Sequence, residues 1–120
     1  MATHNDLGNE GEELAVGHLV QNGWKILERN WRFGREELDI IAQKDDVLSI
    51  VEVKTRFSNF LGEPYEAVSK SKQKSIIRAA NHFVEKNDLD LEVQFDIISI
   101  VLNKNQQKIT HIEEAFSPRW

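Results

Sequence analysis

Hydrophobic side chains recur at helical spacing in two parts of the chain. Within residues 6–22 they fall three or four positions apart, which places them on one face and predicts a helix. Gly23 follows directly and is a favourable residue for ending a helix. A second helix is expected to be capped by Ser69 or a near neighbour and to run to about Lys86. Its apolar positions are Ile76, Ile77, Ala80, Phe83 and Val84.

The other hydrophobic stretches are short, which is typical of strands. Residues 24–33 form the first predicted strand. Residues 37–43 and 47–55 flank a turn-like KDD tripeptide and predict an antiparallel hairpin. The second strand of this hairpin is apolar on both faces, as expected of a central strand. Residues 91–103 predict a further buried strand, which pairs with residues 108–116 after a turn.

The resulting order, α-β-β-β-α-β-β, predicts an α/β fold in which helices flank a mixed β-sheet. A chain of 120 residues fits a single domain covering residues 1–120. Gly62 and Pro64 predict a loop over residues 56–68, before the second helix. No glycine-rich phosphate loop stands between a strand and a helix, which argues against a doubly wound nucleotide-binding fold.

Composition limits the kinds of site and the cellular location that we expect for the protein. Without cysteines it has neither disulfides nor cysteine-ligated zinc. No apolar run approaches the ~20 residues that span a bilayer, and no secretory pattern begins the chain, so we expect a cytoplasmic protein without a membrane partner. The net charge of -5 argues weakly against nucleic-acid binding. Residues 68–84 nevertheless contain no acid, and their basic members are Lys70, Lys72, Lys74 and Arg78.

Three charged residues interrupt the hydrophobic hairpin: Asp39, Glu52 and Lys54. Unpaired buried charges cost several kcal/mol, so these side chains need partners or a ligand. Alternation along a strand places Glu52 and Lys54 on one side, and pairing across the turn can bring Asp39 beside Glu52. The two carboxylates and the Val53 carbonyl would form an all-oxygen pocket suited to Mg²⁺ or Mn²⁺, with Lys54 close to a metal-bound water. The alternative is that these charges reach solvent or pair with one another.

Glu12 is a third acid that the fold can deliver to this hairpin. It lies about 20° from Leu19 on a helical wheel, at the rim of the inward face of the first helix, whereas Glu13 points to the opposite side. An ordinary surface glutamate, favoured by the dipole at the helix start, is the alternative interpretation.

Two more polar residues occupy apolar patterns. Gln73 falls within the apolar stripe of the second helix, so it either meets a specific partner or cleft, or marks where the helix emerges from the core. Asp96 lies inside a predicted buried strand, and we expect it to bond a backbone or arginine group behind the hairpin.

These motifs resemble those of a known superfamily. A helix glutamate, a strand aspartate, an E-x-K strand and a helix with lysines and glutamine resemble the PD-(D/E)XK nucleases. More narrowly, "GEELA", "RNWRFGREELDIIA", "VEVKTR" and "FDIISI" are similar to the YraN-like family of bacterial proteins, which is related to archaeal Holliday junction resolvases. The similarity extends over about residues 8–100.

The resemblance implies a restriction-endonuclease-like core and phosphodiester hydrolysis that depends on Mg²⁺ or Mn²⁺. By position, Asp39 and Glu52 become metal ligands and Lys54 the residue that activates or positions water. Glu12 matches the acid of the first helix, and Gln73 the polar residue that often follows on the next helix.

The first hypothesis is therefore a metal-dependent nuclease acting on DNA, with branched or structured DNA among the candidates. Backbone phosphates would be contacted by Arg56, Lys70, Lys72 and Lys74. A resolvase would act as a homodimer, joined through a sheet edge or the loop at residues 57–65. The alternative is a non-catalytic module that keeps the nuclease fold and binds nucleic acid or protein. A structural domain in an assembly is the third interpretation, but it leaves the buried charges unexplained.

Overall fold

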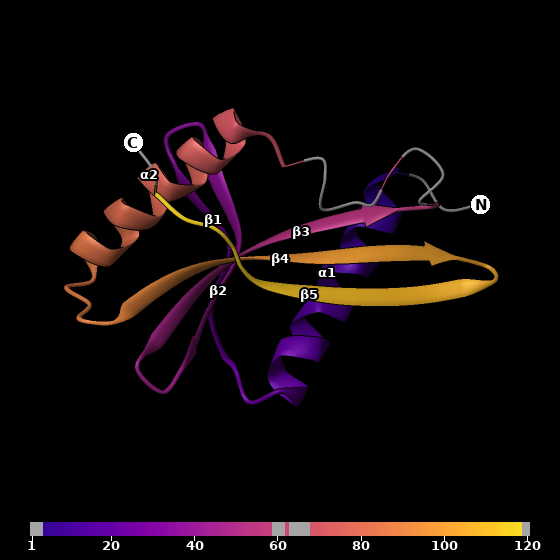
Figure 1. The fold of residues 1–120 in the computed structure, drawn as a ribbon, viewed down its shortest axis with the longest axis horizontal. Helices are drawn as coiled ribbons and strands as arrows, with labels where there is room; N and C mark the ends of the chain where they lie inside the picture. The colour runs from indigo at the N-terminus through magenta and orange to yellow at the C-terminus, as the bar shows by residue number, and fades with distance from the viewer. Residues whose placement is uncertain (1–3, 59–61, 63–67, 119–120) are drawn as a thin grey trace.

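Seven elements follow one another in the order predicted from the sequence. A computed structural model describes residues 4–58, 62 and 68–118 (Figure 1). The elements are α1 (His4–Gln21), β1 (Lys25–Phe33), β2 (Glu36–Lys44), β3 (Val47–Arg56), α2 (Lys70–Lys86), β4 (Glu92–Asn103) and β5 (Gln106–Phe116). The predicted α/β class is confirmed. Of the loop predicted before α2, residues 59–61 and 63–67, Pro64 among them, lie outside the described residues.

The two helix ends predicted from Gly23 and Ser69 are confirmed. Gly23 adopts a φ of +92°, a left-handed conformation that favours glycine and lets the chain turn from α1 into β1. Ser69 caps α2, because its side-chain oxygen accepts a hydrogen bond of 3.1 Å from the Lys72 N–H. Neither described helix is long and apolar enough to cross a membrane.

One five-stranded sheet has the order β1-β2-β3-β4-β5, and β3 is its central strand, as predicted. The β3–β4 pair is parallel and the other three pairs are antiparallel, so the sheet is mixed. Residues of β3 alternate between two hydrophobic cores. Leu48 and Ile50 join the core beneath α2, whereas Val51 joins the core beneath α1.

The sheet forks at the position of the charged residues. The β2–β3 pairing runs from Lys44 opposite Val47 to Ile40 opposite Val51. Beyond that point β2 continues against β1, while β3 continues against β4, with Glu52 opposite Ile97. Figure 1 shows the β1–β2 hairpin separating from β3, β4 and β5. Asp39 and Glu52 are the next residues after the last paired ones, so they stand where the fork opens.

Helix α1 lies close against β3 at the same end of the sheet. A side chain at Gly11 would overlap the hydroxyl and carbon atoms of Thr55, so glycine permits this approach. Glu12 is the next residue along the helix and is thereby carried toward the fork.

Candidate metal centre

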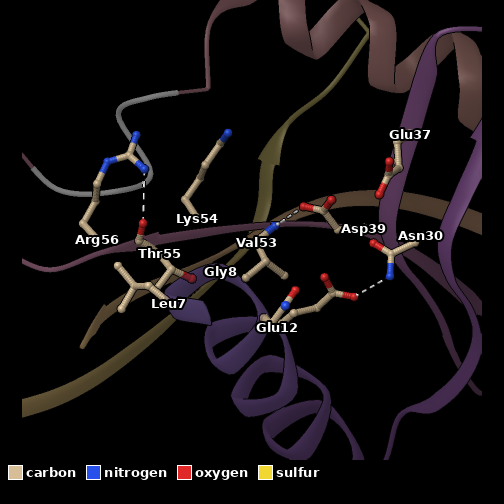
Figure 2. Close-up of a pocket in the computed structure, with 11 residues that line it drawn as sticks. Leu7, Gly8, Glu12, Asn30, Glu37, Asp39, Val53, Lys54, Thr55 and Arg56 are labelled. Atoms are coloured by element: carbon tan, nitrogen blue, oxygen red, sulfur yellow. Dashed lines mark hydrogen bonds between the residues drawn. The ribbon is translucent and has the colours of Figure 1, made fainter. Parts of the chain in front are cut away.

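Asp39 closes the fork with its side chain. Its Oδ2 accepts a hydrogen bond of 2.9 Å from the Val53 backbone N–H, so a carboxylate takes the place of a strand partner (Figure 2). Burial raises the pKa of Asp39, the Val53 N–H lowers it, and the charge of Glu12 raises it again. The resulting pKa lies above the ordinary value of an aspartate. Asp39 therefore occupies a site that disfavours its negative charge.

Glu52 is still more confined. Only 4% of the residue is exposed, and its Oε1 lies 3.8 Å from Lys54 Nζ and 3.9 Å from Lys72 Nζ. Its Oε2 is buried and has no hydrogen-bond partner among the described residues. Burial, together with the nearby charge of Asp39, raises the pKa of Glu52 to about 8. Two carboxyl groups thus share one poorly hydrated space, and the described residues leave one of their oxygen atoms unsatisfied.

The arrangement fits a divalent cation. A proton or a cation must offset the charge of two adjacent buried carboxylates. The donor set is made of oxygen atoms, which Mg²⁺ and Mn²⁺ prefer, and the Oε2 of Glu52, without a hydrogen-bond partner among the described residues, offers a ligand atom. Val53 follows Glu52 in β3 and donates its N–H to Asp39. The residues predicted for a metal therefore lie together at the fork.

Glu12 and Glu13 differ as the helical wheel predicts. The Glu12 side chain is 16% exposed and that of Glu13 is 67% exposed. Glu12 Oε1 accepts a hydrogen bond of 3.0 Å from Asn30 and lies 3.4 Å from an Arg29 nitrogen. Figure 2 shows its carboxylate below Asp39 and turned toward Asn30. Glu12 is thus close enough to act on the pKa of Asp39, although β1 holds its carboxylate.

A cleft of about 410 Å³ opens beside these groups. Lys54 and Arg56 extend from β3 along one side of it, and Glu37 stands on the other (Figure 2). Arg56 donates a hydrogen bond of 3.1 Å to the Thr55 carbonyl. The lining residues are Leu7, Gly8, Asn9, Glu12, Asn30, Glu37, Asp39, Val53, Lys54, Thr55 and Arg56. The cleft is therefore polar, and of the predicted ligands Glu12, Asp39 and Val53 line it, whereas Glu52 lies buried behind it.

The α2 residues separate into two groups. Lys70, Gln73 and Lys74 line a second hollow of about 340 Å³, together with the end of β5. Gln73 donates a hydrogen bond of 3.2 Å from Nε2 to the Val68 carbonyl. The structure therefore gives Gln73 a specific partner but places it on a different hollow from Asp39.

Lys72 alone of these lysines reaches Glu52, and sequence reasoning missed this contact. The helical spacing of the sequence already indicated that Lys72 faces inward. Lys72 stands four residues before Ile76, seven before Ala79 and eleven before Phe83, all of which are buried. It therefore occupies the first position of the inward stripe, although it was expected to act only as a phosphate contact.

A second cluster of possible ligands lies around Asp96. Its side chain accepts hydrogen bonds from Ser49 Oγ at 2.7 Å, His111 Nε2 at 2.9 Å, Gln94 Nε2 at 3.1 Å and the Glu114 N–H at 3.0 Å. Asp96, His111 and Glu113 have ligand atoms within 4.8 Å of one another. Burial alone would raise the pKa of Asp96, but these donors together hold it below its ordinary value. The expected bond to a backbone group is found, and histidine, serine and amide groups donate to Asp96 as well. With every donor in place, Asp96 anchors β5 without requiring a cation.

Comparison with known proteins places the chain in a family. The model of the uncharacterised protein family UPF0102 matches residues 11–100. A UPF0102 protein of Flavobacterium psychrophilum is 50% identical over 116 residues, covering 97% of this chain and 98% of that protein. UPF0102 proteins of Christiangramia forsetii and Phocaeicola vulgatus are 47% and 45% identical, covering 97% and 98% of this chain and 98% of each relative. The YraN-like resemblance is thus confirmed at the level of the family, and the chain belongs to UPF0102.

Proposed function

We propose that this protein is a divalent-metal-dependent nuclease that hydrolyses phosphodiester bonds in DNA. The observation that carries the proposal is Glu52, whose Oε2 is buried without a partner among the described residues, beside a second buried carboxylate. A structural role would be better served by uncharged side chains at both positions. The cost of the charges is explained if a cation offsets it during function.

Each residue of the fork has a role in this proposal. Asp39, Glu52, the Val53 carbonyl and Glu12 would hold Mg²⁺ or Mn²⁺. When bound, such an ion polarises the phosphoryl group and makes bound water more acidic. Lys54, 3.8 Å from Glu52, positions the attacking water and stabilises negative charge developing on the phosphoryl oxygens. Arg56 on the cleft wall contacts the neighbouring phosphates.

The resemblance to PD-(D/E)XK nucleases and archaeal resolvases supports the same function. The observed order of elements matches that of a restriction-endonuclease-like core, and the E-x-K strand is the central strand that borders the fork. DNA in the cytoplasm is the proposed substrate, with branched or otherwise structured DNA included. Paired cuts in such a substrate would require a homodimer.

Cleavage of labelled single-stranded, duplex, flapped and four-way-junction DNA with Mg²⁺ or Mn²⁺ tests the proposal. Asp39→Asn and Lys54→Ala should abolish metal-dependent cutting, whereas Glu13→Gln should not, because Glu13 faces solvent on the same helix as Glu12. Equal cutting by all variants would identify a contaminating nuclease and refute the assignment.

A folded protein that binds Mn²⁺ and DNA but cuts none of these substrates would instead favour the non-catalytic binding module. Binding and cleavage are therefore measured on the same preparations, with thermal unfolding as the check on folding.

A further inference from the structure

Two lysines from different elements converge on one oxygen atom. Lys54 of β3 and Lys72 of α2 lie 3.8 Å and 3.9 Å from Glu52 Oε1. Lys54, on the same strand as Glu52, already brings one cation to this carboxyl group. The contact made by Lys72 is therefore additional, and it comes from a different element, α2.

When both carboxyl groups are ionised, the charges at the fork balance without a metal. Asp39 and Glu52, when ionised, carry two negative charges, and Lys54 and Lys72 carry two positive charges. Glu12 pairs instead with Arg29, which it shares with Glu13. A divalent cation bound to the carboxylates would leave the group with two excess positive charges. That excess is complementary to the phosphate groups of a nucleic acid.

Of the two lysines, Lys72 is the less enclosed. Its side chain is 38% exposed, against 25% for Lys54, and it extends from the first turn of α2 rather than from the central strand. A lysine ammonium on a flexible four-carbon chain exchanges partners readily. Its distance of 3.9 Å from Glu52 is that of an ion pair without a close hydrogen bond.

We propose that Lys72 is a displaceable cation that lies against Glu52 in the metal-free protein and turns to a substrate phosphate once a divalent metal binds Glu52. The inference rests on the proposed function and adds a regulatory step to it. Because Lys72 then serves two anions in turn, metal binding and nucleic-acid binding are linked, and each strengthens the other.

The test uses Lys72→Gln, which removes the charge and keeps most of the side chain. Lys86→Gln is the matched control, because Lys86 lies on the same helix about 21 Å further along its axis and changes the net charge equally. Binding of Mn²⁺ is measured by calorimetry. Loss of the competing ammonium should tighten Mn²⁺ binding roughly two- to five-fold in Lys72→Gln, the range set by the coupling of a partly exposed ion pair.

Binding of labelled flapped DNA is measured in parallel in Ca²⁺, at several salt concentrations. The DNA affinity of Lys72→Gln should fall. In a plot of the logarithm of the association constant against the logarithm of the salt concentration, the slope should become shallower by about the amount that one phosphate contact contributes. Lys72→Arg should restore the slope, because it keeps the charge. A purely structural role for Lys72 would not change the two affinities in opposite directions.

The inference is overturned if Lys72→Gln binds Mn²⁺ no more tightly than the unaltered protein, or if its salt slope equals that of Lys86→Gln. Failure of the proposed function is distinguishable from this result. It would appear as unchanged Mn²⁺ binding in Asp39→Asn, whatever the behaviour of Lys72.

Discussion

Replacing Glu52 by glutamine should remove a pH dependence from the stability of the metal-free protein. The glutamine amide matches the carboxyl group in shape but does not titrate. In the unaltered protein the pKa of Glu52 rises from an ordinary value of 4.5 to about 8, because of burial and the charge of Asp39. Between these two values the unfolded chain has lost its proton while the folded protein retains it.

The sign and size of the effect follow from this difference. The stability associated with protonated Glu52 is fully present below pH 4.5 and is lost as the pH rises toward about 8. At about 1.4 kcal/mol for each pH unit, the whole window corresponds to an upper bound of about 5 kcal/mol in the free energy of unfolding. Asp39 is shifted in the same direction, so it adds to the slope rather than opposing it.

Urea unfolding at closely spaced pH values, in EDTA, measures this slope. The unaltered protein should lose stability more steeply than Glu52→Gln across the window, while Glu13→Gln should follow the unaltered protein because Glu13 faces solvent. Adding Mn²⁺ should flatten the slope of the unaltered protein, since the metal replaces the proton. Equal slopes for the unaltered protein and Glu52→Gln would refute the claim that Glu52 is buried as an unsatisfied acid.

Four further substitutions examine other contacts. Asp39→Asn should abolish Mn²⁺ binding in calorimetry without unfolding the protein by circular dichroism; collapse or normal binding would contradict the site. Gly11→Ala should cost about 1–3 kcal/mol in urea unfolding, because its Cβ overlaps Thr55, whereas Gly17→Ala, with open space around it, should gain up to about 1 kcal/mol. Asp96→Asn should cost about 2–4 kcal/mol near neutral pH and flatten the loss of stability in acid, because the pKa of Asp96 is lowered in the folded protein.

Local pattern was sufficient for most of the fold. Ser69 and Gly23 act on the backbone of their own helix ends, and the KDD turn joins adjacent strands, so neighbouring residues determine these features. The juxtaposition of Asp39 and Glu52 also follows from counting back from that turn. The placement of these two residues could therefore be predicted because it depends on short-range pairing.

What the sequence did not reveal depends on contacts between distant elements. The extent of pairing between β2 and β3 is decided by how β1 and β4 draw the strands apart, and no local pattern encodes it. Three of the four partners of Asp96 come from other strands. Ser49 in β3 lies 47 residues before it, and His111 and Glu114 in β5 lie 15 and 18 residues after it. Lys72 reaches Glu52 because of the way α2 packs against the sheet, which the local sequence does not encode. Its position on the buried stripe of α2 could nevertheless be predicted from the helical spacing.

The fork also explains how a hydrophobic hairpin tolerates its charges. Inside a continuous ladder, the carboxylate of Asp39 would have no backbone donor to accept from, because each N–H would be engaged by the facing strand. Where the strands separate, the Val53 N–H becomes available and Asp39 binds it, while Glu52 remains behind with one oxygen atom unpartnered among the described residues. The same opening that frees the N–H exposes the cleft beside it. The fork is therefore unfavourable for stability and open to solvent on one side. This combination is expected where ligand binding, rather than folding, determines which residues are present.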